Sequence, residues 1–411
     1  MSLAAFVLTV ALAVQPAETI TEIRVHGNTT VSDEMVIELA GVTIGSAFEA
    51  GTAAAVEKRL RASGRFDNVE VRKRYRTLEM DQVSLLVVVD EKPGISATGA
   101  PPGVGRRIRS HMMFLPILQY DDGYGWTYGA RTSFVDIAGK GGRLSVPLSW
   151  GGTRRAAVEA DRTFKSGPFS RVSASYGIAQ RENPFYDIDD RRHALTGRVE
   201  RRLFGALTLG ADVSRTDVTF EPLRDSFWTT GADVTLDTRR DPAYPSNAIL
   251  ATATWGRMGP IGSASFAGPI DRYRLDARGY KRLFGQTVLA VRAEYDTASA
   301  PLPSYEQWLL GGGTLRGTPS GTFVGDKRLL TAAEIRVPFS SPLSAARVGF
   351  NVFFDAGGTA AYGDRLLDTH LYRGVGGGLW LTAAILNLNL NVAHSPDGKG
   401  TRVHFGTGFS F

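Results

Sequence analysis

From about residue 112 to the C-terminus, apolar and polar residues alternate with a period of two, and this pattern limits the possible folds more than any other feature. In ILNLNLNV, Leu386 and Leu388 fall on one face and Asn387 and Asn389 on the other. Successive side chains of a β-strand point to opposite faces. The pattern therefore predicts a series of strands, each with one apolar and one polar face.

Sixteen such segments follow one another, separated by turn-forming residues. A soluble β-sandwich would turn the apolar faces inward, whereas a membrane barrel turns them to lipid and keeps a polar lumen. The polar faces carry dense charge, as in DRYRLDARGY, and the strand count is too large and too even for one sandwich. We therefore predict an all-β transmembrane antiparallel barrel at residues 109–411. The strands are expected to start near Met112, Gly125, Gly142, Thr153, Pro168, Arg191, Gly205, Phe227, Asn247, Ile270, Gln286, Lys327, Arg347, Leu371, Ile385 and Arg402.

The composition agrees with this prediction and excludes several classes of protein. Hydrophobic residues make up 43%, and an alternating barrel has such an ordinary average. The absence of cysteine excludes a disulfide framework and thiolate metal sites. The net charge of +6 arises from 47 basic and 41 acidic residues, which indicates a mixed, solvated surface rather than a nucleic-acid-binding face.

The first residues have the pattern of a secretory signal. An apolar core runs from Leu3 to Val14, and Ala11-Leu12-Ala13 fits the small-x-small cleavage pattern. We expect residues 1–17 to be a signal peptide that is cleaved after Ala13 or Ala17. The alternative is a buried strand.

Residues 18–93 follow a different pattern and predict a small α+β domain. A strand ends at the turn signal Gly27-Asn28, Ser32 can cap a helix through Ala40, and a second helix is expected from Phe48 to Ser63. RFDNVEVRKRY and DQVSLLVVVDEKPG then predict two further strands. A Pro/Gly-rich linker at residues 94–108 separates this domain from the barrel.

Three segments of this domain, IRVHGNTTVS, RLRASGRFDNVEV and LLVVVDEKP, resemble a POTRA domain, the periplasmic module of outer-membrane assembly and secretion barrels. The resemblance implies that an exposed strand edge receives extended chains by strand addition. The alternative is a rigid spacer that only positions the barrel.

The barrel resembles the BamA/TamA outer-membrane assembly-factor superfamily, of the bacterial surface antigen type, which includes the two-partner secretion transporters. DTRRDPAYPSNA resembles the family's periplasmic turn before the ninth strand, and GDKRLLTAAEIRVPF and FFDAGG resemble its twelfth and thirteenth strands. LRGTPSG resembles the motif of its sixth outer loop, and VHFGTGFSF resembles the terminal strand signal of outer-membrane barrels. The corresponding residues are Asp237, Tyr244 and Pro245 in the turn, Leu315, Arg316 and Gly317 in the loop, and Phe405, Phe409 and Phe411 in the last strand.

Alternation gives the motif arginine two candidate partners. In TAAEIRVPF, Ala333 and Ile335 lie on the apolar face, so Glu334 points into the lumen, and the same reasoning places Asp355 there. The resemblance implies that the loop folds into the barrel and that Arg316 bonds to such carboxylates. We expect a lock that holds an active conformation; the alternative is an ion pair that only stabilises the fold. GGGTLRG lacks the lysine and the strand-to-helix context of a phosphate loop.

No catalytic constellation is apparent in the sequence. The six histidines show no metal-binding spacing and no GxSxG occurs, so we expect neither an enzyme nor a metal or other cofactor. The resemblance implies an assembly, insertion or translocation factor in the bacterial outer membrane, with its POTRA domain in the periplasm. It would pass client strands from the POTRA edge to a lateral seam between the first and last barrel strands.

The partners that the resemblance implies are unfolded outer-membrane or secreted polypeptides and membrane lipid. It leaves room for periplasmic or lipoprotein partners and implies no nucleic acid. Two alternatives stay open: a passive pore or structural barrel, and a barrel that handles lipid or surface polymers.

Overall fold

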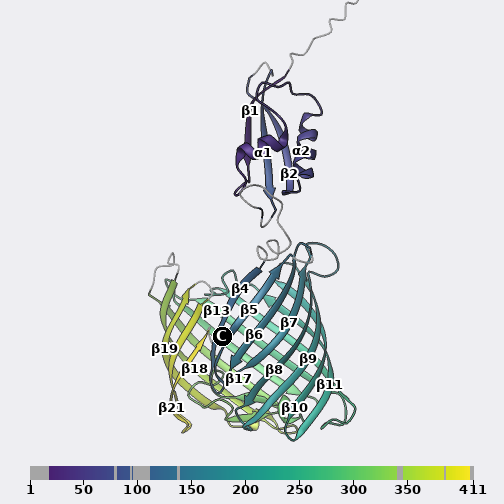
Figure 1. Ribbon diagram of the computed structural model, residues 1–411. Coiled ribbons are helices and arrows are strands. Elements are labelled where there is room, and N and C mark those ends of the chain that lie inside the picture. Colours follow the sequence, from purple (N-terminus) through teal and green to yellow (C-terminus); the bar gives the residue numbers. More distant parts are fainter. Residues whose placement is uncertain are drawn as a thin grey trace, which may run out of the picture. The chain divides into compact units, whose positions relative to one another are not determined.

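The computed structural model describes residues 18–77, 81–92, 95, 112–136, 139–339, 346–383 and 386–407. The chain divides into two units, Met1–Met112 and Met113–Phe411 (Figure 1). The expected signal peptide at residues 1–17, the linker apart from Ile95, and Phe409 and Phe411 lie outside the described residues. Neither helix in the described ranges is long and apolar enough to cross a membrane.

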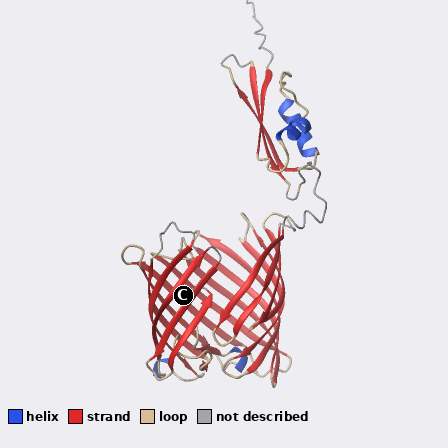
Figure 2. Cartoon of the chain, turned by 60° about the vertical axis from the view of Figure 1, so that its left-hand side comes forward, coloured by secondary structure: helices blue, strands red, loops and turns tan. Residues whose placement is uncertain are grey.

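The first unit is a three-stranded sheet with two helices on one face (Figure 2). Its sheet order is β1-β3-β2, with β3 parallel to β1 and antiparallel to β2. Ser32 caps α1 as expected, whereas α2 begins later than the predicted Phe48, because Thr52 first accepts a hydrogen bond from the Glu49 N–H in a preceding turn. The elements are β1 (Thr19–His26), α1 (Asp33–Ala40), α2 (Thr52–Ala62), β2 (Phe66–Tyr75) and β3 (Gln82–Glu91).

Glu91, at the end of β3, fixes the loop that precedes α1. Its carboxylate accepts hydrogen bonds from the backbone N–H groups of Thr29, Thr30 and Val31, the last at 2.7 Å. Burial pushes the pKa of Glu91 up, but these backbone hydrogen bonds outweigh burial and hold the pKa below its ordinary value. The carboxylate therefore joins the sheet to the start of the helical layer.

The second unit is one antiparallel sheet of sixteen strands, which confirms the predicted fold and strand number. Each strand pairs with its neighbour along the chain, and the connection from β14 to β17 carries two additional short strands that pair with each other. Strand starts differ from the prediction by a few residues, as at β11, which begins at Leu223 rather than Phe227.

The barrel strands are β4 (Met112–Asp121), β5 (Gly125–Val135), β6 (Gly142–Gly151), β7 (Arg154–Thr163), β8 (Arg171–Asn183), β9 (Ile188–Leu203), β10 (Leu207–Phe220), β11 (Leu223–Asp237), β12 (Ala248–Ile261), β13 (Ile270–Arg282), β14 (Val288–Ala298), β17 (Lys327–Pro338), β18 (Ala346–Ala360), β19 (Tyr372–Ala383), β20 (Leu386–Ser395) and β21 (Gly400–Thr407). The connections hold η1 (Ser304–Glu306), β15 (Trp308–Leu310), β16 (Phe323–Gly325) and η2 (Leu366–Asp368).

Burial in the barrel is inverted relative to a soluble protein. Tyr128, Trp150 and Leu275 are about half exposed on the outer face, whereas Ser133 and Ser145 are buried on the inner face. Outward apolar side chains and inward polar ones are the arrangement of a barrel that is surrounded by lipid. The alternation read from the sequence therefore sets the inner and outer faces.

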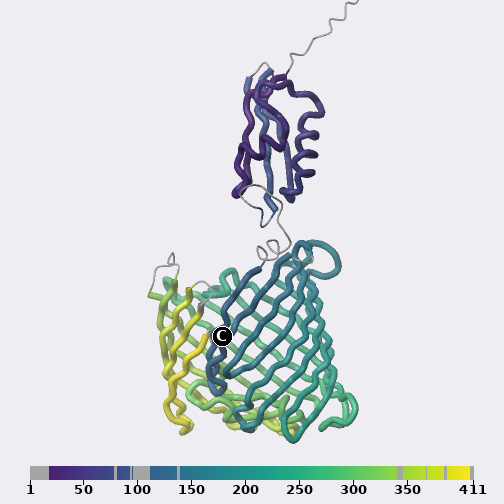
Figure 3. The backbone as a smooth tube through the Cα atoms, in the orientation of Figure 1, coloured from purple at the N-terminus to yellow at the C-terminus, as the bar shows by residue number. Residues whose placement is uncertain are grey.

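The two end strands of the sheet, β4 and β21, meet at a boundary that we call the seam. The Phe405 ring lies 5.9 Å from the Tyr120 ring and 5.5 Å from the Trp126 ring, measured between centroids. Figure 3 shows the dark blue β4 and the yellow β21 beside each other. Among the described residues the strand pairings run from β4 round to β21, and none joins these two strands directly. The seam is therefore held there by side chains.

Candidate functional site

The connection from β14 to β17, which we call the plug loop (residues 299–326), folds into the lumen rather than away from the barrel. It contains η1 and the short hairpin of β15 and β16. Its residues Leu310 and Leu315 are fully buried with Leu330 of the barrel wall, and Phe323 and Tyr372 pack against them. The plug loop thus has its own apolar core inside a largely polar lumen.

Arg316, the motif arginine, lies at the centre of this site and is 1% exposed. Its Nε–H and one Nη2–H donate to the two carboxylate oxygens of Asp355, each at 2.7 Å, and its backbone N–H donates to the same carboxylate at 3.2 Å. Its Nη1 donates to Glu334 at 2.9 Å. These are charge-assisted bonds, one of them a bidentate pair, which is the strongest common arrangement between side chains.

The register of β17 and β18 explains how these groups meet. Ala332 is paired with Asp355 and Glu334 with Phe353, so both carboxylates and the Phe353 ring project from adjacent inward positions. The Arg316 guanidinium lies 3.3 Å from the Phe353 ring centroid, a cation–π contact in a buried site. Alternation correctly predicted that Glu334 and Asp355 point inward. It did not single out Phe353, which points inward from β18 for the same reason as Asp355.

A second arginine, Arg336, completes the cluster. Its Nε donates to the other oxygen of Glu334 at 2.8 Å, and both side chains are 2% exposed. Two guanidinium groups and two carboxylates therefore form a neutral, buried group of four charges. Removal of one partner from such a group leaves an uncompensated buried charge, which costs about 3–5 kcal/mol.

Glycines let the motif lie directly on the barrel wall. Gly317 has φ +88, and a Cβ there would lie 2.9 Å from the His394 carbonyl carbon. A Cβ on Gly374 would lie 1.9 Å from the Arg316 carbonyl oxygen. Thr318, the next residue of the motif, is fully buried. The motif therefore crosses β19 and β20 at backbone contact distance.

The predicted turn before β12 closes the opposite end of this cluster. Asp237 binds the Arg239 guanidinium with two bonds of 3.0 Å, and Pro245 is buried. The Tyr244 hydroxyl shares its proton between the carbonyl oxygens of Gln286, at 2.9 Å, and Arg336, at 3.3 Å. The turn thus reaches the backbone of Arg336, whose side chain shares Glu334 with Arg316 of the plug loop, a link that the sequence did not indicate.

A further anchor of the plug loop was missed from the sequence. Glu306, in η1, forms ion pairs with Arg192 of β9, at 2.7 Å, and with Arg272 of β13. The neighbouring Tyr305 hydroxyl donates to Asp225 at 2.5 Å. A buried apolar cluster supports this end of the loop; it comprises Val218, Phe220, Phe227, Met258, Ile270, Ala298, Leu302 and Tyr305. No motif marks Glu306, and only the inward position of the two arginines could have suggested an acidic partner.

The third predicted group, the terminal strand signal, is represented by Phe405. It is half-buried on the outer face and contacts Tyr120 and Trp126 across the seam. Its inward neighbour His404 is buried and takes part in the site, which the sequence did not indicate.

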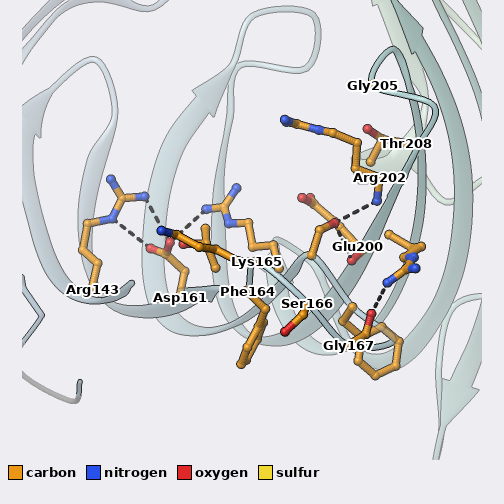
Figure 4. Close-up of a pocket in the computed structure, with 15 residues that line it drawn as sticks. Arg143, Asp161, Phe164, Lys165, Ser166, Gly167, Glu200, Arg202, Gly205 and Thr208 are labelled. Atoms are coloured by element: carbon orange, nitrogen blue, oxygen red, sulfur yellow. Dashed lines mark hydrogen bonds and ion pairs between the residues drawn. The ribbon is translucent and has the colours of Figure 1, made fainter. Parts of the chain in front are cut away.

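A basic basin of about 750 Å³ lies at the end of the lumen opposite the plug loop, around the turn between β7 and β8 (Figure 4). Asp161 binds Arg143 at 2.9 Å and Arg171 at 3.5 Å, whereas Lys165 and Arg202 form no ion pair with any described residue. The basin therefore presents excess positive charge and can attract acidic groups. The lining cations are Arg143, Lys165, Arg171, Arg201 and Arg202, and the lining acids are Asp161 and Glu200.

Within the described ranges, no group of three or more His, Asp or Glu side chains is arranged to hold a metal ion. The functional residues that do come together are charged and aromatic groups that hold one segment of chain to another. Their chemistry is that of binding and conformational coupling.

Comparison with known families and structures places this geometry in context. The POTRA family model, described as a surface antigen variable number repeat, matches residues 18–92, and the model of the Omp85 superfamily domain matches residues 139–411. No curated protein matches.

Many solved structures are similar to the chain, and two of them show the extent of the likeness. The structure of BamA from Haemophilus ducreyi lacking POTRA domains 1–3 aligns with a TM-score of 0.63 at 13% identity and covers 95% of this chain and 84% of that one. CdiB from Escherichia coli aligns with a TM-score of 0.50 at 13% identity and covers 98% and 92%. At these identities the likeness concerns the fold.

Proposed function

Because the chain belongs to the Omp85 superfamily, we propose that it is an outer-membrane factor that inserts or translocates other polypeptides. Its clients are unfolded outer-membrane or secreted polypeptides, which the POTRA domain receives in the periplasm and the seam accepts in the membrane. The chain does this without catalysis or a cofactor, since the client's own folding and burial provide the driving force.

The observation that carries this proposal is the seam. In the described residues β4 and β21 have no direct strand pairing, so each leaves backbone N–H and C=O groups along one edge. Unpaired backbone groups are costly in lipid, and a client strand that pairs with the edge satisfies them. A seam held by side chains can therefore exchange those contacts for a client's backbone hydrogen bonds.

The first unit offers a matching edge outside the membrane. β1 and β2 each pair only with β3 among the described strands, and an isolated bridge from Ala47 covers the start of β1. On β2 the Val69 carbonyl accepts from Arg61 and the Val71 N–H donates to Glu57, so the free part of its edge lies beyond Val71, towards Tyr75. An extended client segment can add to it by strand addition before it reaches the barrel.

The plug loop favours the lateral route over an open pore. It is held in the lumen by Glu306 at one end and Arg316 at the other, and its core is buried. A passive pore would show a large steady conductance in planar bilayers. We expect a low conductance for the wild-type chain.

The central test is depletion of the protein in its native host, followed by quantitative proteomics of the outer membrane and the medium. We expect one or more barrel or secreted proteins to fall, and re-expression of the wild-type chain to restore them. Unchanged levels of all of them would count against the proposal and favour a structural barrel.

Photo-crosslinking locates the client on the chain. A photoreactive residue at Arg74, on the β2 edge, and one at Leu118, on β4, should capture the same polypeptide. The matched control is Leu275, which is equally exposed to lipid but lies in the fully paired part of the sheet. Capture at Leu275 to the same extent would indicate random encounters in the membrane.

A further inference from the structure

His404 is buried on the inner face of β21 and contacts groups from two other parts of the barrel. Its Nε2 lies 2.9 Å from the backbone nitrogen of Gly317, in the plug-loop motif. Its Nδ1 lies 3.0 Å from a carboxylate oxygen of Asp122, in the turn that follows β4. The His404 imidazole therefore links β21, the strand on which it lies, to the plug loop and to the turn after β4.

Elementary hydrogen bonding fixes the roles of the two ring nitrogens. A backbone N–H can only donate, so Nε2 accepts from Gly317. In a neutral imidazole the other nitrogen then carries the proton, and Nδ1–H donates to Asp122. A side chain at position 404 must therefore accept one hydrogen bond and donate another. An aromatic ring of the same shape without the two nitrogens can make neither bond.

The plug loop lies against the β4 turn beyond this imidazole as well. A Cβ built on Gly123 would lie 2.4 Å from the Ser320 Cβ, and one on Gly312 would lie 3.0 Å from the Asp122 carboxylate. The loop thus packs on the turn after β4 while its motif is bonded to β21. At this end of the barrel the two seam strands are connected through the loop.

We propose that His404 is a positioning residue that couples the plug loop to the seam. The chain Asp122–His404–Gly317 holds β21 to the turn after β4 while Arg316 keeps the loop in the lumen. The seam at this end opens only when this chain of hydrogen bonds breaks. The inference rests on the proposed function in taking the seam as the client's route, but the coupling itself requires no client.

The absence of cysteine from the chain permits a direct test in the full-length protein. The pair Tyr120→Cys with Phe405→Cys reports on the seam through a short bifunctional thiol reagent. The control pair Leu275→Cys with Tyr295→Cys replaces directly paired outward residues of β13 and β14. Crosslinking is measured on protein whose barrel is folded, as judged by its heat-dependent migration on gels.

Two substitutions separate hydrogen bonding from packing. His404→Phe keeps the ring shape and loses both bonds, and we expect seam crosslinking to slow about three- to tenfold, the range for lost net hydrogen bonds. His404→Gln offers one acceptor and one donor, and we expect a change of less than about twofold. The control pair should be unaffected in both backgrounds.

Several outcomes would overturn the coupling. If the rate of seam crosslinking is unchanged in His404→Phe, or falls equally in His404→Gln, the two hydrogen bonds do not couple the loop to the seam. His404 then acts only through packing. Asp122→Ala, in a half-buried turn, is a second variant that should loosen the seam if His404→Phe does not fold. Arg316→Ala should also loosen the seam, because the loop then loses its hold.

The outcomes also separate this inference from the proposed function. A seam that responds to His404→Phe, in a protein whose depletion changes no other polypeptide, would retain the coupling and reject the function. If depletion changes the level of another polypeptide but the seam does not respond to His404→Phe, the proposed function is retained and the coupling is rejected.

Discussion

Glu306 and Arg316 anchor the two ends of one loop with opposite charge arrangements. At Glu306 the loop supplies the acid and the wall supplies two arginines, whose side chains remain 28% and 26% exposed. At Arg316 the loop supplies the base, and the wall carboxylates are 2% exposed. The same loop is therefore held by a partly hydrated ion pair at one end and a dry one at the other.

The difference decides what each anchor can do. Water can solvate Arg192 and Arg272 when their partner leaves, so the Glu306 end can release at moderate cost. Glu334 and Asp355 have no such access, so loss of Arg316 leaves two buried carboxylates whose one remaining ion-pair partner among the described residues is Arg336, which binds Glu334. The Arg316 anchor is also connected to the seam, because the N–H of the neighbouring Gly317 donates to His404 on β21.

Removal of the dry anchor should have the largest effect. We expect Arg316→Ala to destabilise the barrel by about 3–5 kcal/mol, because it leaves uncompensated buried charge. Denaturant unfolding of the purified protein measures this loss, and bilayer conductance should rise as the loop leaves the lumen. Arg224→Ala, at a highly exposed arginine, is the matched control and should change neither quantity.

Removal of the partly hydrated anchor should cost less. We expect Glu306→Gln to destabilise the barrel by about 1–3 kcal/mol, since the arginines regain water and the apolar cluster around Tyr305 still holds the loop. The same unfolding measurement applies. A loss equal to that of Arg316→Ala would show that hydration does not distinguish the two anchors.

A side chain under the motif should act without any change of charge. Gly374→Ala places a Cβ 1.9 Å from the Arg316 carbonyl oxygen, so the motif must shift from β19. We expect a loss of about 1–3 kcal/mol, typical of overpacking. Gly268→Ala has open space around its Cβ and should be neutral in the same assay.

The smallest effect is expected for a carboxylate that binds backbone groups outside the barrel. The pKa of Glu91 is held below its ordinary value by the N–H groups of Thr29, Thr30 and Val31. Its contribution to the stability of the first unit is therefore complete above the ordinary pKa and is lost as the pH falls through the depressed value. The protection of the Thr29–Val31 amides from hydrogen exchange, measured relative to the intrinsic rate at each pH, should fall over that pH range.

Glu91→Gln is the control for this pH dependence. It removes the titrating group, so exchange at the three amides should be faster at neutral pH and lose its acid-dependent step. An unchanged step would assign the titration to another group.

The sequence was sufficient to predict the strands of the barrel wall, but not the path of the plug loop in the lumen. Period-two alternation gives the inward or outward direction of every strand residue, and this placed Glu334 and Asp355 on the inner face. The family resemblance, and not alternation, then implied that Arg316 bonds to these two inward carboxylates on neighbouring strands. The path of the plug loop has no period, so nothing in the sequence placed Glu306 against β9 and β13.

The residues that join separate elements were hidden for the same reason. His404 and Arg336 stand at inward positions like many others, and their importance depends on which loop or turn reaches them. Alternation gives the side of a residue but not its depth in the lumen or its neighbour across the lumen. The depth of a residue in the lumen and its neighbour across the lumen become clear only from the folded structure.

The plug loop has a geometric consequence for the growth of the barrel. Its two anchors form a chord across the ring, from β9 and β13 at Glu306 to β17 and β18 at Arg316. The chord divides the circumference into two arcs, and the seam lies on the arc that runs from β18 through β21 and β4 to β9. Under the proposed function, each client strand added at the seam would lengthen the circumference by about 4.8 Å. That length would enter only the seam arc while the arc from β9 to β18 keeps its curvature, so the widened ring would be lopsided.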